Sequence, residues 1–446
     1  MSVWQELGQV CALPARMRAL SLPLKEDVGE QAEKSKQGNP IPVGDDWICP
    51  LRTQESEAPQ SVSSIAELEV YLNKLVEFGA PPGLSLAVAK DGAIVYNKAF
   101  GQADGPNDGA ATPETVYQWM SLSKIVTATA IIQLHERGSL NIHDEVSTYL
   151  PFFKVQYPSD GSEKITIRHL LNHSSGVPDL QGVFDMFHME GESPPAQAAL
   201  MKSALDDNSR LKFEPGSQGT YINTGHLVLS VIVETVSGGS FREYVVEDIF
   251  RPLKMEHTDY VYSEEMLRHA AVGSQPNAAI VNVFVALTSD RFDEVIRETV
   301  DGRMWYKRFL LDFPGVGGII SPAGDVARFV MAFLNGGELD GARILSPESV
   351  AMMTREENIV EVKGGPTSVY KGLRHGLGWW TWPDGDRQRL MHTGSGPGFA
   401  AIMQLYPEER LGIILLGNEF AYGAALPFSG TVPRDAIAHL AASLAW

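Results

Sequence analysis

Ser121 and Lys124 are the residues whose types and spacing point most directly to chemistry. Residues three apart share one face of a helix, so the lysine amine would lie beside the serine hydroxyl. The first turn of a helix also presents unpaired N–H groups and positive potential, which favour an oxyanion and disfavour the ammonium form of Lys124. A serine beside an amine that can take its proton predicts catalysis through an acyl-enzyme.

The flanking residues place this pair at the start of a buried helix. Tyr117 and Trp119 precede the serine, apolar residues follow at helical spacing from Ile125 to Leu134, and Gly138 is a C-terminal stop. Because a Ser-x-x-Lys motif alone is common, its interpretation depends on further motifs.

Two more polar groups complete a candidate site. Tyr221 and Asn223 lie just before a helix expected over about residues 226–236, and His392, Thr393, Gly394 and Ser395 end a strand expected to begin near Arg389. Tyr71 and Asn73 repeat the Tyr-x-Asn spacing, but they precede the serine and lie in an amphipathic helical segment. The order along the chain therefore selects Tyr221.

Ser-x-x-Lys, Tyr-x-Asn and His-Thr-Gly in this order resemble the serine beta-lactamase and penicillin-binding-protein family. The nearest branch contains class C beta-lactamases, family VIII carboxylesterases, D-aminopeptidases and D,D-peptidases. Segments 166–176, 250–255, 317–319 and 376–379 carry the same resemblance, which covers about residues 65–446. It implies an α+β, beta-lactamase/transpeptidase-like fold, with an antiparallel sheet flanked by helices and a mostly helical domain beside the active site.

The resemblance also implies a part for each motif residue. Ser121 is the nucleophile, and its N–H forms an oxyanion hole with the N–H of Ser395. Either Lys124 or Tyr221 is the acylation base, the tyrosine only if a nearby ammonium lowers its pKa. The substrate-binding residues are Asn223, His392, Thr393, Gly394 and Ser395. Gly394 lets the substrate approach the strand edge closely.

His392 departs from the lysine that many beta-lactamases carry at this place. An ordinary imidazole, with a pKa of about 6.5, is largely neutral above pH 7. A substrate carboxylate, such as that of a beta-lactam, should bind less well here than beside a lysine. Neutral esters are therefore favoured.

The elements expected around these motifs divide the chain into three parts. Residues 1–62 form an extension outside the family pattern, residues 63–145 and 314–446 form the sheet domain, and residues 146–313 form the mostly helical domain. Lys90-Asp91-Gly92 predicts a hairpin between strands at 84–89 and 93–97. Further predictions are a helix over residues 65–78, strands at 376–381, 389–392, 399–406 and 411–417, and a closing helix at 435–444.

Composition excludes several classes of function. A formal charge of −19 argues against binding to nucleic acid or to an anionic membrane surface. The sequence also lacks a run of eighteen apolar residues, which a membrane-spanning helix would need. Cys11 and Cys49 give no disulfide framework. The N-terminal residues do not fit a signal peptide, so a cytoplasmic location is expected. The oligomeric state is left open.

Other residues have the spacing of a site but do not complete one. His169 and His173 have the spacing of metal ligands on a helix, but Leu170 replaces the glutamate of a zinc hydrolase, so no metal site is predicted. The sequence contains no Gly-x-Ser-x-Gly, phosphate-loop or dinucleotide motif, and no cofactor is implied.

The leading interpretation is a serine hydrolase that cleaves small carboxylic esters through an acyl-enzyme on Ser121. A D-amino-acid amidase or peptidase and an acyltransferase of the same fold are the nearest alternatives. A beta-lactamase and a non-catalytic assembly protein are weaker ones. The expected partner is a small-molecule ester or amide substrate.

Overall fold

A computed structural model describes residues 59–107, 109–180, 185–207, 209–277, 291–355, 372–420 and 433–446. Residues 1–58, which make up most of the predicted N-terminal extension and include Cys11 and Cys49, lie outside these ranges.

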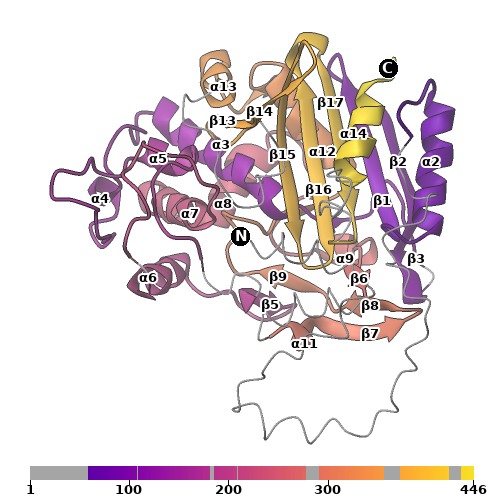
Figure 1. Ribbon diagram of the computed structural model, residues 1–446, viewed down its shortest axis with the longest axis horizontal. Helices are drawn as coiled ribbons and strands as arrows, with labels where there is room; N and C mark the ends of the chain where they lie inside the picture. The colour runs from indigo at the N-terminus through magenta and orange to yellow at the C-terminus, as the bar shows by residue number, and fades with distance from the viewer. Residues whose placement is uncertain are drawn as a thin grey trace, which may run out of the picture.

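An eight-stranded antiparallel sheet joins the two ends of the chain (Figure 1). Its order is β13-β14-β15-β16-β17-β1-β2-β3, so the last strand pairs with the first. The strands are β13 (Arg374–His375), β14 (Trp380–Asp384), β15 (Arg387–Gly396), β16 (Phe399–Tyr406), β17 (Leu411–Gly417), β1 (Gly83–Lys90), β2 (Ala93–Asp104) and β3 (Gly109–Ala110). The α+β class predicted from the sequence is confirmed.

The hairpin predicted at Lys90-Asp91-Gly92 is present. Strand β1 ends at Lys90 and β2 begins at Ala93, while Asp91 and Gly92 have φ values of 52° and 82°. A two-residue turn with positive φ at both positions matches the twist of the flanking strands, and Asp-Gly tolerates it.

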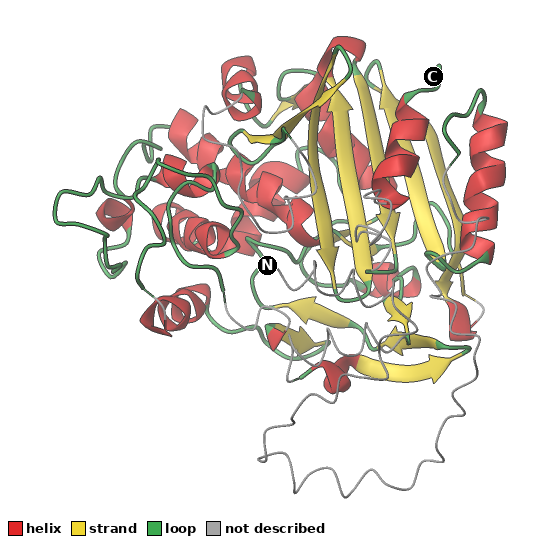
Figure 2. Cartoon of the chain, in the orientation of Figure 1, coloured by secondary structure: helices red, strands yellow, loops and turns green. Residues whose placement is uncertain are grey.

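Helices cover both faces of the sheet (Figure 2). α2 (Ile65–Glu77) and α14 (Pro433–Ala442) share an apolar cluster with one face. α3 (Ser123–Glu136) and α12 (Ala323–Leu334) belong to the larger cluster on the other face. Because both faces are covered, every residue of β16 and β17 is buried, and these strands read as apolar runs rather than as alternating patterns.

Between the two halves of the sheet the chain forms short helices and two small antiparallel sheets. The helices are α4 (Val146–Tyr149), α5 (Ile167–Leu171), α6 (Gln197–Asp207), α7 (Thr224–Ser237), α8 (Phe241–Val245), α9 (Glu264–Arg268) and α11 (Phe292–Val295). The strands are β5 (Phe187–Met189) paired with β9 (Phe309–Leu311), and β6 (Ser274–Pro276), β8 (Arg303–Tyr306) and β7 (Ile296–Val300) in the second sheet. Helix α7 is the one predicted after Tyr221. The boundaries of the mostly helical domain stay a prediction.

Smaller strands and one further helix lie at other points of the chain. β4 (Tyr117–Gln118) pairs with β10 (Ile320–Ser321), and β11 (Glu338–Leu339) pairs with β12 (Ala342–Arg343). Helix α13 (Pro347–Thr354) follows.

The single strand predicted at 376–381 is wrong. The chain turns there between β13 and β14, and the N–H of Gly376 donates to the Trp379 carbonyl at 2.7 Å. Gly378 has a φ of 92°, which a continuous strand cannot contain. The two glycines that the pattern assigned to a strand instead make the turn.

Within the described ranges, no helix has the length and apolar character needed to cross a membrane.

Candidate active site

Ser121 is the one partly exposed residue in a buried stretch of chain. Every other residue from Thr115 to Leu134 is buried. Ser121 lies in the 3₁₀ turn Met120–Leu122 directly before α3, and Met120 has a left-handed φ of 53°. A residue with a side chain disfavours that conformation, so the surrounding packing must hold it. The turn therefore exposes the Ser121 side chain to solvent while its neighbours in the chain remain buried.

Lys124 points its amine at this hydroxyl. Its Nζ donates to Ser121 Oγ at 3.0 Å and to the Val316 carbonyl at 3.0 Å, and the side chain is fully buried. Burial lowers the lysine pKa from 10.5 to about 7, with the Asp179 carboxylate opposing the shift. Near neutral pH a large fraction of the amine is therefore uncharged, and its lone pair can accept the serine proton.

Tyr221 completes the group around the serine. Lys124 Nζ lies 5.1 Å from the centre of the tyrosine ring, and the ring is almost entirely buried. Burial raises the pKa of Tyr221 above its usual value, although a hydrogen bond with Ser121 opposes the shift. The phenol is therefore neutral and can donate a proton.

Asn223 follows Tyr221 by two residues, and its amide bonds a carboxylate. Its Nδ2 donates to Asp179 Oδ2 at 3.3 Å, and its backbone N–H donates to Asp179 Oδ1 at 2.6 Å. No sequence pattern singles out Asp179, because it follows Gly176 and Pro178 in a segment that resembles an ordinary turn. Its carboxylate is partly exposed and lies against the motif Tyr221-Ile222-Asn223.

The end of β15 lies against the serine turn. Pairing with β14 stops at Met391, so the stretch from His392 to Gly396 continues past its neighbour. A Cβ on Gly394 would collide with the Trp119 carbonyl oxygen and come within 3.1 Å of the Ser121 nitrogen. Only glycine permits this approach, which brings the strand edge next to the serine N–H.

Thr393 and Ser395 are accessible on this strand end, whereas His392 is not. Thr393 is partly exposed and Ser395 is exposed. The His392 ring is fully buried and stacks on Trp380, with 4.0 Å between centroids. Its Nδ1–H donates to the Thr393 carbonyl at 2.8 Å, and burial, together with Lys124, lowers its pKa well below 6.5. His392 is therefore a neutral group in the wall behind Tyr221, and direct substrate contact by it stays a prediction.

Arg434, on the first turn of α14, also supports this strand end. It is fully buried, and its Nη1 donates to the Gly394 carbonyl at 3.0 Å and to Ser395 Oγ at 2.9 Å. The sequence pattern gave no signal for it, because an arginine at a helix start resembles a surface residue. A permanent cation thus lies beside the strand although position 392 carries none.

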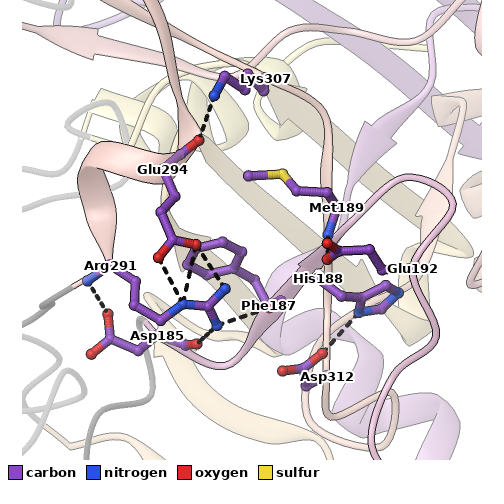
Figure 3. Close-up of polar contacts among 9 residues, drawn as sticks. All are labelled: Asp185, Phe187, His188, Met189, Glu192, Arg291, Glu294, Lys307 and Asp312. Atoms are coloured by element: carbon purple, nitrogen blue, oxygen red, sulfur yellow. Dashed lines mark hydrogen bonds and ion pairs between the residues drawn. The ribbon is translucent and has the colours of Figure 1, made fainter.

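A second polar cluster lies around Asp312, shortly before Val316 in the chain (Figure 3). His188 and Asp312 form a 2.8 Å contact between β5 and the end of β9, and the Asp312 carbonyl accepts from Gln197 at 2.7 Å. Arg291 ties Asp185 and Phe187 to α11 through their carbonyls. Asp312 lies four residues before Val316, whose carbonyl accepts from the Lys124 amine.

The described part of the chain contains no cluster of histidine, cysteine and acidic side chains able to hold a metal ion. His169 and His173 do not share a helix face, since α5 ends at Leu171 and His173 has a φ of 61°. Instead, Nδ1 of His169 accepts from the Thr166 N–H at the helix start.

Comparisons with known proteins bear on the family and the fold of this chain. The family model described as Beta-lactamase matches residues 72–427. Penicillin-binding protein 4* of Bacillus subtilis (strain 168) is 29% identical over 340 residues, which cover 75% of this chain and 68% of that protein. The structure of D-amino acid amidase from Ochrobactrum anthropi SV3 with D-phenylalanine superposes with a TM-score of 0.66 at 22% identity, covering 84% of this chain and 98% of that one.

Another relative is longer than the region it shares with this chain. Protein flp of Staphylococcus aureus (strain MRSA252) is 24% identical over 355 residues, covering 79% of this chain. The match spans only 62% of that relative's own length.

Proposed function

Because this chain belongs to the beta-lactamase family, we propose that it is a serine hydrolase that cleaves small carboxylic esters through an acyl-enzyme on Ser121. One observation carries the proposal. Ser121 is the sole partly exposed residue of a buried stretch, and a buried amine lies 3.0 Å from its hydroxyl. Such an arrangement activates a nucleophile at a solvent-facing point.

Lys124 acts as the acylation base in this proposal, and Tyr221 acts as a proton donor. The opposite directions of their pKa shifts support this division, since the lysine is brought toward neutrality and the phenol is kept protonated. Ser121 attacks the carbonyl carbon while Lys124 takes its proton, and Tyr221 donates its own proton to the departing alkoxide and regains one from Lys124. Water then attacks the acyl carbonyl and gives a proton to Lys124. The bond to Ser121 breaks, the serine oxygen regains a proton from the same pair, and the acid is released.

The oxyanion hole of this proposal consists of the N–H groups of Ser121 and Ser395. The close approach of Gly394 to the Ser121 nitrogen supports it, because it brings the two amides to one place. Removal of one such donor typically costs about 3 kcal/mol of barrier. Thr393 and Asn223 are partly exposed and would orient the substrate.

Neutral ester substrates are supported by the uncharged wall around Tyr221. Trp380 and His392 form this wall, and neither carries a charge near neutral pH. A substrate carboxylate would find no permanent cation at position 392, and the buried Arg434 guanidinium already donates to the Gly394 carbonyl and to Ser395 Oγ, so beta-lactam turnover should be slow.

A D-amino-acid amidase or peptidase is the second candidate. An amine leaving group needs a proton more than an alcohol does, and the protonated phenol of Tyr221 beside Ser121 can supply it. The fold similarity to the Ochrobactrum amidase is in line with this alternative. An acyltransferase would use the same acyl-enzyme with an alcohol in place of water. The small ester or amide partner and the cytoplasmic location also remain proposals.

Intact-mass spectrometry tests these candidates together. The protein is incubated with a short aryl ester, a D-amino-acid amide and a beta-lactam, and mass gain and loss are followed in wild type and Ser121→Ala. We expect a transient acyl adduct from the ester, absent in the variant. A stable beta-lactam adduct, turnover of the amide alone, or no adduct from any substrate would each replace or remove the ester proposal.

A further inference from the structure

One short loop holds the backbone on both sides of Tyr221. The carbonyl of His173 accepts from the Thr220 N–H at 3.0 Å, and the Nδ1 of the same residue accepts from the Ile222 N–H at 3.3 Å. A single residue therefore fixes the two peptide groups that flank the tyrosine. The pair of contacts leaves the Tyr221 backbone little freedom to rotate.

The other end of the loop holds the next two residues. Asp179 Oδ1 accepts from the N–H groups of Asn223 at 2.6 Å and Thr224 at 3.4 Å, and the Pro178 carbonyl accepts from the Thr224 hydroxyl at 2.7 Å. Residues 173–179, here called the loop 173–179, thus bond to every residue from 220 to 224 except Tyr221.

His173 also contacts the tyrosine ring itself. The two ring centroids are 4.7 Å apart, and on its other sides His173 meets His226 at 5.0 Å and His375 at 4.9 Å. Since Nδ1 accepts a hydrogen bond, the proton of the neutral ring is on Nε2. Burial lowers the pKa of His173 well below 6.5, so the accepting lone pair persists across the physiological pH range.

The backbone conformation of His173 also contributes to this arrangement. Its φ of 61° is left-handed, a conformation that most side chains disfavour and that asparagine and glycine tolerate best. The conformation turns the chain out of α5 and lets one residue present its carbonyl and its ring to the same segment.

We propose that His173 is a positioning residue for Tyr221, holding the phenol beside Ser121 and Lys124 through its hydrogen bonds to Thr220 and Ile222 and its contact with the ring. The inference rests on the proposed acyl-enzyme chemistry. It gives a role to a histidine that the sequence analysis considered individually only for its metal-like spacing from His169. A proton donor displaced by about 1 Å can lose on the order of a hundredfold in rate, so such a residue matters without touching substrate.

The test compares His173→Asn with His173→Gly. Both residues accept the left-handed backbone, but only asparagine keeps an acceptor near the Nδ1 position. We expect the glycine variant to lower kcat for an aryl ester by roughly 30- to 100-fold with KM changed less than about threefold. The asparagine variant should stay within about fivefold of wild type. An asparagine variant as impaired as glycine, or a fully active glycine variant, would overturn the proposal.

His226→Leu is the matched packing control. His226 is buried against His173, and neither of its ring nitrogens has a hydrogen-bond partner in the described part of the chain. Leucine fills a similar volume, so activity should change less than about twofold. A loss equal to that of His173→Gly would show that general packing of the histidine cluster, rather than the bonds to residues 220 and 222, sets the rate.

A double-mutant cycle shows whether His173 acts through the tyrosine. In the Tyr221→Phe background, His173→Gly should lower the remaining rate by less than about threefold, because the group it positions is already gone. Multiplicative losses would contradict the proposal. If the glycine variant does not fold, His173→Gln replaces it, since its amide extends one bond too far for the Ile222 N–H.

An NMR readout separates this inference from the hydrolase proposal. With tyrosine labelled by ¹³C at Cζ, the Tyr221 signal is identified by its loss in Tyr221→Phe. It should shift or broaden in His173→Gly and remain near its wild-type position in His173→Asn and His226→Leu. An unchanged signal in the glycine variant would overturn the positioning inference even if the protein forms acyl-enzymes. The expected shifts would uphold it even if no substrate acylates Ser121.

Discussion

Ser121 and Lys124 form a pair in which the serine hydroxyl contributes little to the stability of the fold. Ser121 is partly exposed and bonds the lysine amine, so Ser121→Ala should abolish turnover and covalent labelling while shifting the melting temperature by no more than about 2 °C. Thermal melts and intact-mass labelling check this.

Ser123→Ala is the comparison that locates the nucleophile. Ser123 is buried, and its Oγ accepts from the Ile319 N–H at 3.3 Å. Its removal should cost about 1 kcal/mol of stability and leave labelling intact. Labelling that survives in Ser121→Ala but fails in Ser123→Ala would refute the assignment.

The pH dependence of the site should come from Lys124. Because its pKa in the folded protein is about 7, kcat/KM for a neutral ester should rise with pH around a midpoint near 7. The unfolded lysine titrates near 10.5, so between these two pH values the unfolded chain holds a proton that the folded protein lacks. The contribution of Lys124 to the free energy of unfolding therefore increases with pH through that window.

Rate profiles of wild type and His226→Leu check which group titrates. The pKa values of His173, His226 and His392 are lowered well below 6.5 by burial, so these rings stay neutral across the profile. The midpoint should be the same in both proteins. A midpoint that moves by a full unit in the histidine variant would assign the ionisation to an imidazole instead.

At the scale of elements, the approach of β15 to the serine turn decides whether the site forms. Gly394→Ala would drive a methyl group into the Trp119 carbonyl and toward the Ser121 nitrogen. Backbone atoms cannot move aside as a flexible side chain can, so the change should cost about 1–3 kcal/mol of stability and lower kcat at least about tenfold.

Gly161→Ala is the control for this substitution. A Cβ at Gly161 meets nothing within 4 Å, so the alanine variant should stay within about 0.5 kcal/mol of wild type with full activity. Denaturant unfolding and ester turnover measure both effects. A Gly394→Ala variant that behaves like the control would mean that the strand end does not need to lie so close to the serine.

For the whole molecule, the joining of the two chain ends makes α2 part of the fold. Leu68, Leu72 and Leu75 of α2 are buried in the cluster that also contains α14. Removal of residues 1–58 leaves this helix and its N-cap Ser64 in place, so ester hydrolysis should be retained. Loss of kcat in a folded, monodisperse 59–446 protein would show that the N-terminal residues reach the site.

A longer truncation through Glu77 should prevent folding. Truncating one buried leucine to alanine typically costs about 2–5 kcal/mol, and three such losses match the total stability of an ordinary domain. Circular dichroism and size-exclusion chromatography distinguish the two truncations. A folded 78–446 protein would mean that the cluster on this face is dispensable.

The sequence by itself determined the elements whose signals are local. Asp91 and Gly92 specify their hairpin because turn chemistry depends on two residues, and the buried strands at 399–406 and 411–417 matched their predicted limits because long apolar runs leave few alternatives. The motif residues Ser121 and Lys124 could likewise be paired in advance, since three-residue spacing at a helix start fixes their neighbourhood.

Only the tertiary structure decided which distant residues surround that pair. His173 and Asp179 meet the Tyr221 segment across more than forty residues of chain, and Arg434 reaches Gly394 across a similar span. Loops and helix ends carry no periodic pattern that records such partners, because their conformations follow from contacts made after the sheet has joined the chain ends. The same reason explains why the strand predicted at 376–381 is interrupted by a turn at Gly376, and why burial lowers the pKa of Lys124. Both depend on the residues that pack around them.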